Sequence, residues 1–364
     1  MRIEEARVEV LDIPFSEPVI SGVQRWEHHR AGIIALRTTN DFEGLGELPV
    51  PPPDQLGDDI PGRLIRALEG LELGHASMIE GVLCDIEAWP SVGRPARSAV
   101  ESALVDVLAR LADQSVASFL FAGSRRDVAV NALLGIGPPE EAALLAAELV
   151  DAGYRCLKLK AGVEPDGALQ RRVAAVREAV GPDVALRLDF NGSLAPETAE
   201  DVLAGVAQFD LEYAEQPISP AEGAEALARL RWTGAVPIAA DESVRDLGAA
   251  RVLLDSGAVD ALVVKPTRVG GLRQAGAIVE LATSAGVSVT VSTMFETGVG
   301  LAGALHLAAT APGTGAHGLA TAGLLESDLL RTPLDISHGR MEVPDGPGLG
   351  IELDTDAVER YRRA

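Results

Sequence analysis

Lysines and carboxylates recur at nearly equal intervals through the middle of this chain. The intervals are 29 residues from Lys160 to Asp189, 26 to Glu215, 26 to Asp241 and 24 to Lys265. Each residue ends or directly follows a short aliphatic run, and each interval is the length of one strand and one crossover helix. Because parallel strands bring their carboxyl ends to one rim, the spacing predicts a (β/α) barrel whose mouth gathers these five side chains.

Stretches rich in Ala and Leu, with helical length and period, lie between the aliphatic runs. They span residues 140–152, 169–180, 221–230 and 272–285. Alternating strands and helices favour a parallel sheet, and seven or eight repeats favour its closure. The predicted fold class is therefore α/β, with a barrel over residues 123–323.

The first 122 residues have a different order of elements. Strands are predicted over 3–11 and 32–38, separated by a polar loop, and helices over 60–71 and 97–112. Strands followed by helices are typical of an α+β domain. We expect such a domain to precede the barrel, and a tail rich in Pro and Gly to follow it from residue 324.

The charge and cysteine content of the chain limit the kinds of molecule that it is expected to bind. Against 54 Asp and Glu there are 31 Lys and Arg, a net charge of −23, so nucleic acid is a poor partner. Two cysteines, Cys84 and Cys156, are too few for a disulfide framework. The sequence shows no signal-peptide pattern and no apolar run of membrane-spanning length, so we expect neither a secreted nor a membrane-spanning protein. We expect a cytoplasmic homo-oligomer that binds a small molecule and neither nucleic acid nor membrane.

Lys158 and Lys160 are two residues apart, so on a strand they share one face. An isolated pair of this kind is usually solvated on an exposed strand. The leucines around these two favour a buried strand, where an inward lysine pair is unfavourable without a function. Two close ammonium groups lower each other's pKa, and a lysine base near neutral pH needs a pKa of roughly 7–8.

The three carboxylates are ambiguous one by one, because Asp189, Glu215 or Asp241 could be a helix N-cap or a salt-bridge partner. Together on one rim they would repel each other without a cation. Oxygen ligands with no Cys or His nearby select Mg²⁺ or Mn²⁺ over zinc. Asn191 and Glu242 are candidates for supporting these ligands, or for capping the next helix.

Taken together, these motifs resemble those of the enolase superfamily, in its muconate-cycloisomerase-like branch. They are Lys-x-Lys, Asp-x-Asn, Glu-Gln-Pro, Asp-Glu-Ser and Lys-Pro, and the likeness includes the tail at 343–350. The resemblance implies a modified (β/α)₇β TIM barrel with an α+β capping domain over residues 1–122. It also implies that residues 324–364 return towards the capping domain.

The resemblance also implies roles for the site residues. Asp189, Glu215 and Asp241 would bind Mg²⁺, with Mn²⁺ as an alternative. Lys160 matches the base that removes a proton α to a carboxylate, which forms an enediolate. The other two lysines match its neighbour, Lys158, and the lysine across the barrel, Lys265.

The histidines argue against another branch of the superfamily. The mandelate-racemase-like branch uses a His–Asp dyad on the later strands. Here Lys265 stands on the sixth strand, and the histidines at 28, 29, 75, 306, 317 and 338 fit no dyad. His306 lies in a predicted Ala-Leu helix and is expected to pack there.

Three segments bear on the substrate. Residues 264–271 and 294–300 are most similar to o-succinylbenzoate synthases and N-acylamino acid racemases. Residues 317–322 resemble the last strand of some of those synthases and lack the Asp-x-Asp of dipeptide epimerases. Arg187, on the face of Asp189, could bind a second substrate carboxylate or form a salt bridge inside the barrel, and Arg268 is a further candidate beside the substrate.

The predicted activity is that of a lyase, a Mg²⁺-dependent o-succinylbenzoate synthase performing syn-dehydration in menaquinone biosynthesis. An N-acylamino acid racemase, with Lys160 and Lys265 on opposite faces of the substrate, is the alternative, followed by a muconate-type cycloisomerase. A non-catalytic ligand-binding barrel would not need all these charged residues. Loops at 16–30 and 47–56 are expected to be mobile and to close over the substrate.

Overall fold

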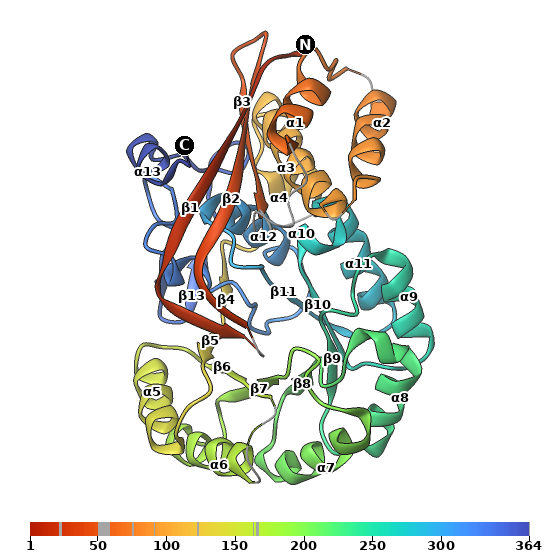
Figure 1. Cartoon of the computed structure of the whole chain (residues 1–364), viewed down its shortest axis with the longest axis vertical. Coiled ribbons are helices and arrows are strands. Elements are labelled where there is room, and N and C mark those ends of the chain that lie inside the picture. Colours follow the sequence, from red (N-terminus) through yellow and green to blue (C-terminus); the bar gives the residue numbers. More distant parts are fainter. Residues whose placement is uncertain are drawn as a thin grey trace.

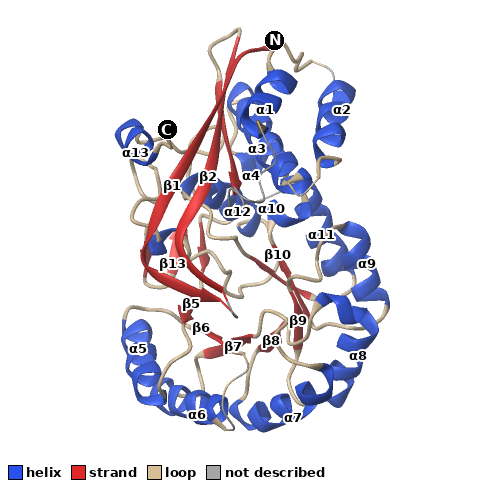
Figure 2. Ribbon diagram, in the orientation of Figure 1, coloured by secondary structure: helices blue, strands red, loops and turns tan. Residues whose placement is uncertain are grey.

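The structure of the protein is a computed structural model that describes residues 1–21, 24–49, 59–74, 76–90, 92–121, 124–162, 164 and 167–363. An antiparallel sheet with its helices stands at one end of the molecule, and a curved parallel sheet forms the other (Figure 1). Figure 2 shows that the helices of the second part lie outside its strands, as in a barrel.

A three-stranded antiparallel sheet opens the chain. Its strands, in sheet order, are β1 (Ile3–Ser21), β2 (Gln24–Thr38) and β3 (Glu43–Pro49). The polar loop predicted after the first strand is wrong, because β1 and β2 stay paired as far as Ser21 and Gln24. Ile13 and Phe15 are buried in this extension, but the register shifts between Pro14 and Val19, which hides the period of two in the sequence.

Helices pack on one side of this sheet. They are α1 (Ile60–Leu68), α2 (Ala76–Glu87), α3 (Gly93–Leu111) and α4 (Val116–Leu120). Two glycines let α3 lie directly on β3. A Cβ atom on Gly46 would lie 2.0 Å from the Ala99 carbonyl oxygen, and one on Gly44 would lie 2.3 Å from that of Ala103. The alternating glycines of β3 therefore set the contact between helix and sheet.

Seven parallel strands form the barrel sheet, in chain order. They are β5 (Ala132–Leu134), β6 (Cys156–Lys160), β7 (Ala185–Asp189), β8 (Tyr213–Glu215), β9 (Ile238–Ala240), β10 (Ala261–Val264) and β11 (Ser288–Val291). The eighth position is a two-residue segment, in which His317 bridges to Val130 and Gly318 to Ser292. This segment joins the two edges of the sheet, and the predicted (β/α)₇β barrel with an α+β N-terminal part is confirmed.

Helices follow the strands in alternation. They are α5 (Pro139–Asp151), α6 (Ala168–Val180), α7 (Pro196–Val206), α8 (Gly223–Thr233), α9 (Leu247–Asp255), α10 (Pro266–Val269), α11 (Leu272–Ser284) and α12 (Gly298–Ala308). Short 3₁₀ turns lie at η1 (Ala207–Phe209), η2 (Pro220–Glu222) and η3 (Ala322–Leu324). The four stretches predicted as helices correspond to α5, α6, α8 and α11.

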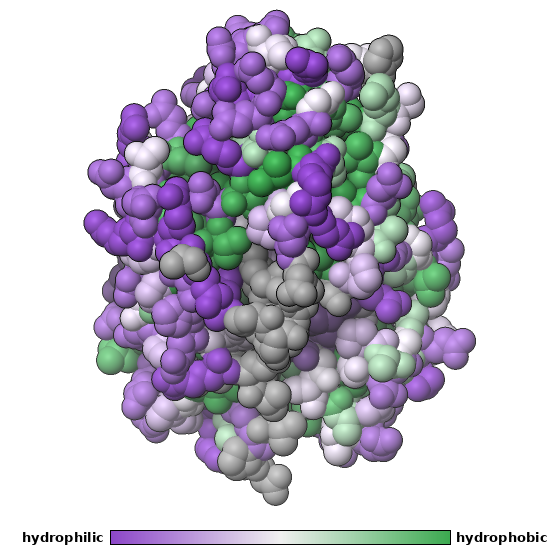
Figure 3. All heavy atoms as spheres, turned by 45° about the horizontal axis from the view of Figure 1, so that its top comes forward, coloured by the Kyte–Doolittle hydropathy of each residue, from purple (hydrophilic) through white to green (hydrophobic). Residues whose placement is uncertain are grey.

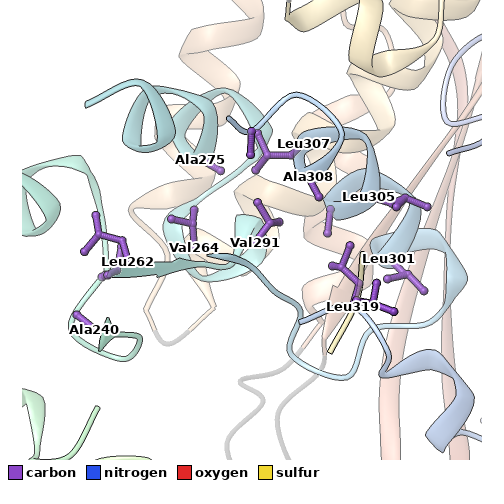
Figure 4. Close-up of a cluster of buried hydrophobic side chains, with 14 of the residues drawn as sticks. Ala240, Leu262, Val264, Ala275, Val291, Leu301, Leu305, Leu307, Ala308 and Leu319 are labelled. Carbon is purple, nitrogen blue, oxygen red and sulfur yellow. The ribbon is translucent and has the colours of Figure 1, made fainter. Parts of the chain in front are cut away.

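The main core lies between the barrel strands and these helices. In Figure 4, Leu262 and Val264 of β10 and Val291 of β11 belong to one buried cluster with Ala275 of α11 and Leu301 of α12. Each such aliphatic side chain contributes about 1.5–3 kcal/mol by leaving water. Because strand residues alternate, one half of each strand packs outward against the helices, and the other half, polar in β6 and β7 and apolar in β9 and β10, forms a separate set.

The C-terminal residues contact both ends of the molecule. β12 (Ile336–Ser337) and β13 (Arg340–Glu342) form an antiparallel sheet with β4 (Asp127–Ala129). α13 (Thr355–Tyr361) follows, and the backbone N–H of Arg363 donates to the Val10 carbonyl at 2.9 Å. We propose that the chain is divided as the sequence predicts, into a cap over 1–122, a barrel over 123–323 and a segment over 324–364 that returns towards the cap.

The surface is mainly polar on the face shown in Figure 3, where hydrophobic residues gather in the upper half. Large apolar side chains that are mostly exposed include Leu144 on α5 and Trp232 on α8. Among the described residues, no helix has the length and apolarity needed to cross a membrane.

Candidate active site

The strand register brings the predicted residues to one rim. Lys160 pairs with Asp189 and Asp189 with Glu215 along β6, β7 and β8. Asp241 directly follows β9, and Lys265 directly follows β10. The carboxyl ends of five consecutive parallel strands therefore carry these side chains, which is where barrel enzymes build their sites.

Lys158 and Lys160 both point into the barrel and bind Asp189. The Lys160 Nζ lies 2.8 Å from Asp189 Oδ2 and donates to Asn191 Oδ1 at 2.8 Å. The Lys158 Nζ lies 3.0 Å from Asp189 Oδ2 and 3.0 Å from Glu215 Oε1. All four of these charged residues are buried, so the exposed-strand interpretation of the lysine pair is wrong.

On the other side of the rim, Asp241 binds two cations. Its Oδ2 lies 2.7 Å from the Lys265 Nζ, and its Oδ1 pairs with Arg268 of α10. Asp241 is fully buried, whereas the side chains of Lys265 and Arg268 keep 11% and 19% exposure. The two cations therefore reach from solvent to a buried carboxylate.

Asn191 and Glu242 form a link between the two sides. The Asn191 amide donates to Glu242 Oε1 at 3.1 Å while its carbonyl accepts from Lys160. Neither residue caps a helix, because α7 begins at Pro196 and α9 is capped by Asp246. The same helix boundaries exclude the N-cap alternative for Asp189 and Asp241.

Burial and charge shift the carboxyl groups in opposite directions. Burial acts to raise the pKa of Asp189, but Lys158 and Lys160 together hold it well below its usual range. Burial and the neighbouring Asp189 raise the pKa of Glu215 to about 7, against the opposing effect of Lys158. For Glu215, burial and its acidic neighbours therefore outweigh the attraction of Lys158.

The expectation of a lowered lysine pKa is wrong for Lys158. Burial favours its neutral form, but Asp189 and Glu215 raise its pKa well above the ordinary value. Two anions at 3.0 Å outweigh a neighbouring ammonium group. In this arrangement Lys158 is an ion-pair partner of both carboxylates.

The carboxylates fit a hard divalent cation by their chemistry. Asp189, Glu215 and Asp241 offer only oxygen, as Mg²⁺ and Mn²⁺ prefer. Within the described ranges Glu215 Oε2 is buried and has no hydrogen-bond partner. As the side chains stand, no three His, Cys, Asp or Glu residues of the described chain are grouped to hold a metal ion. The ammonium of Lys158 lies between two of the carboxylates instead.

Arg187 belongs to a deeper layer of the barrel. Its Nε lies 2.7 Å from Glu212 Oε2, and its Nη1 donates to Asn131 Oδ1 at 3.2 Å and to the Ala316 carbonyl at 2.9 Å. Its guanidinium also stacks over the Tyr213 ring at 4.7 Å. These contacts are those of the barrel-interior salt bridge, so we do not assign Arg187 to the substrate.

The capping sheet reaches the same end of the barrel (Figure 1). Phe15 of β1 meets Phe295 edge to face, with 5.6 Å between ring centroids. Glu47 of β3 accepts hydrogen bonds from the Thr297 and Gly300 N–H groups at 2.9 Å each. The expected closing loops at 16–30 and 47–56 stay a prediction, and residues 22–23 and 50–56 lie outside the described residues.

The scarcity of lysine is a sequence signal that points to the site and that the motif analysis did not use. Lys158, Lys160 and Lys265 are the only lysines of the 364 residues, and the remaining 28 of the 31 basic residues are arginines. Arginine stays protonated at any physiological pH, whereas a lysine can lose its proton when its surroundings favour it. All three lysines of the chain therefore pair with carboxylates of the barrel. The second omission is Gln216, which lies in the Glu-Gln-Pro motif without an assigned role.

Known proteins resemble this chain in sequence and in architecture. The family model described as Enolase C-terminal domain-like matches residues 141–357. Muconate cycloisomerase 1 of Rhodococcus opacus is 30% identical over 371 residues, covering 100% of this chain and 99% of the relative. The o-succinylbenzoate synthase of Thermobifida fusca (strain YX) is 37% identical over 243 residues, covering 64% of this chain and 73% of the relative.

Among similar solved structures is a dipeptide epimerase from Enterococcus faecalis V583, complexed with Mg and the dipeptide L-Leu-L-Tyr. It has a TM-score of 0.87 and 28% identity, and the match covers 97% of this chain and 100% of that one. The family model spans more than half of the chain, and the cycloisomerase matches its full length. The chain therefore belongs to the enolase superfamily, in its muconate-cycloisomerase-like branch.

Proposed function

We propose that this protein removes a proton α to a substrate carboxylate, with Lys160 as the base. The observation that carries the proposal is the placement of Lys160 and Lys265. Counting β5 as the first barrel position and His317-Gly318 as the eighth, Lys160 ends the second strand and Lys265 follows the sixth. The two lysines therefore stand half a turn apart, on opposite sides of a substrate held at the centre.

Asp189, Glu215 and Asp241 are the residues proposed to hold Mg²⁺, with Mn²⁺ as a substitute. The bound ion would supply positive charge beside the substrate carboxylate, which lowers the free energy of the anion left by proton removal. The Mg in the similar dipeptide epimerase supports this proposal. Asn191 accepts a hydrogen bond from Lys160 and donates one to Glu242, and we propose that these two bonds hold Lys160 in position relative to Asp241, the neighbour of Glu242.

For the reaction we propose syn-dehydration of the o-succinylbenzoate synthase type, which makes the protein a lyase of menaquinone synthesis. The neutral Lys160 amine takes the proton as the C–H bond α to the carboxylate breaks. Lys160 then returns this proton as the C–O bond breaks, so that the hydroxyl leaves as water. Lys265 stabilises the anion by charge. The 37% identity to the synthase over its matched length supports this choice.

Isomerase activity is the second candidate. Two observations favour it: the full-length match to a muconate cycloisomerase, and the pair of opposed lysines, which suits a racemase of N-acylamino acids. A racemase protonates one face of the α carbon and deprotonates the other, so it needs both lysines as proton carriers. A dehydratase of the proposed type needs proton transfer from Lys160 alone.

A substrate panel tests the choice. Purified protein with Mg²⁺ is assayed with the succinyl-cyclohexadiene carboxylate, with cis,cis-muconate and with a set of N-succinyl amino acids. We expect dehydration of the first with a kcat/KM at least 100-fold above that for the others. Racemisation or lactone formation without dehydration would make the isomerase the correct assignment.

A further inference from the structure

Gln216 sits where the barrel ladder between β8 and β9 ends. The two strands share only two residue pairs, Ala214 with Ile238 and Glu215 with Ala239. The last backbone bond runs from the Gln216 N–H to the Ala239 carbonyl at 2.8 Å. Beyond this point the side chain of Gln216, instead of the backbone, forms hydrogen bonds with the segment that follows β9.

All four hydrogen-bonding positions of the Gln216 amide are used. Its Oε1 accepts from the backbone N–H groups of Asp241 at 3.1 Å and Ser243 at 3.0 Å. Its Nε2 donates to the Ile218 carbonyl at 2.8 Å and to Ser243 Oγ at 2.9 Å. Since a carbonyl only accepts and an N–H only donates, these partners fix which end of the amide is oxygen.

The backbone of Gln216 is held in an unfavourable conformation. Its φ is +39°, in the left-handed region, although the residue is not glycine and precedes Pro217. Such a conformation is sterically unfavourable for a residue with a Cβ atom and persists only when the surroundings impose it. The side chain is fully buried, so its bonds are not exchanged with water. The strained backbone of Gln216, next to Glu215, is therefore held in place by side-chain hydrogen bonds, one of which is to the backbone of Asp241.

We propose that Gln216 is the positioning residue for the cation-binding carboxylates. It follows Glu215 in the chain and holds the backbone N–H of Asp241, so one buried amide sets the distance between two of the three carboxylates. This inference rests on the proposed role of these residues in holding Mg²⁺. It assigns to the Glu-Gln-Pro motif a function in the site, through geometry and not through contact with substrate.

Mn²⁺ binding to metal-free protein, measured by isothermal titration calorimetry, tests the inference without an activity assay. Gln216→Met keeps the length of the side chain and loses all four bonds. We expect its dissociation constant to be roughly 10- to 100-fold weaker than that of the wild type, as for other residues that orient ligands. Gln216→Glu keeps the acceptor and loses the donor, so its dissociation constant should lie between the two.

Two controls separate positioning from general damage. Gln170→Met makes the same chemical change on α6, and Val176→Ala removes buried methyl groups from α6, which lowers stability away from the rim. Both should keep the wild-type affinity for Mn²⁺. Wild-type affinity in folded Gln216→Met, or in Gln216→Glu if Gln216→Met does not fold, would overturn the inference. A wild-type protein that binds no Mn²⁺ would overturn the metal site and this inference together.

Discussion

Lys160 and Lys265 stand half a turn apart on the barrel rim, each bound to a different buried carboxylate. The Lys160 Nζ lies 2.8 Å from Asp189, and the Lys265 Nζ lies 2.7 Å from Asp241. Neither lysine shares its carboxylate with the other. Their proton-transfer roles can therefore be changed one at a time.

Lys160→Ala should remove nearly all dehydration, a loss of roughly 100- to 10,000-fold in kcat, because the α proton then has no acceptor. Lys265→Arg should retain measurable dehydration, since it keeps the charge beside Asp241, and should lose any racemisation. The measurement is solvent deuterium uptake at the α carbon, followed by NMR. Intact racemisation in Lys265→Arg would contradict the two-lysine assignment. With three lysines in the chain, selective lysine labelling reports each one separately.

Removal of the divalent ion should abolish turnover. Excess EDTA leaves Asp189 and Glu215 paired with lysines instead of the divalent ion, so we expect no detectable product until Mg²⁺ is restored. Asp241→Asn should have nearly the same effect, because it also leaves Lys265 and Arg268 without their anion. Turnover and thermal unfolding with and without Mg²⁺ check this. Full activity in excess EDTA would refute the assignment of all three carboxylates.

Gly271→Ala should destabilise the contact between α3 and the turn that joins α10 to α11. A Cβ atom at Gly271 would lie 1.6 Å from Glu101 Oε2, and its φ is +133°. Gly286→Ala is the matched control, with φ +71° and no atom within 4 Å of its added Cβ. Backbone strain alone costs about 1–2 kcal/mol, so we expect that loss in the control and a larger one at Gly271. Urea unfolding compares the two, and equal losses would contradict the steric argument.

Acid should lower the free energy of unfolding through His317, which lies in the segment that joins the two edges of the barrel sheet. Burial, with a contribution from Arg125 and Arg187, lowers the pKa of His317 from 6.5 to about 3, and its Nδ1 accepts the Val291 N–H at 3.0 Å. Above pH 6.5 the ring is neutral in both states. As the pH falls from 6.5 towards 3, the unfolded chain takes up a proton that the folded chain excludes, so stability is lost.

The loss should reach about 2–3 kcal/mol at pH 4.5. His317→Asn keeps an acceptor for the Val291 N–H and does not titrate, so its free energy of unfolding should fall less between pH 6.5 and 4.5. His338→Asn, at an exposed histidine, is the control and should follow the wild-type slope. Identical slopes in His317→Asn and the wild type would exclude His317 as the acid-sensitive group.

The predictable part of the site came from the strand period. Lys160, Asp189 and Glu215 occupy matched register positions, because equal strand and helix lengths in a parallel barrel bring successive strand ends level. Arg187 shows the limit of this argument. It shares a face with Asp189 but lies two residues deeper, about 7 Å, and its partner Glu212 comes from the start of the next strand. No local pattern pairs these two residues.

The sequence by itself determined the order of strands and helices, the family, and which charged residues stand at the carboxyl ends of the strands. These depend on short-range periodicity, which each segment carries within a few residues. The tertiary structure alone decided the long β1–β2 hairpin, the charge state favoured at Lys158 and the four bonds of Gln216. In the hairpin, the register shift hides the strand period. Lys158 pairs with Glu215, 57 positions away, and Gln216 binds Ser243, 27 positions away, and burial strengthens these interactions only once the barrel has closed around them.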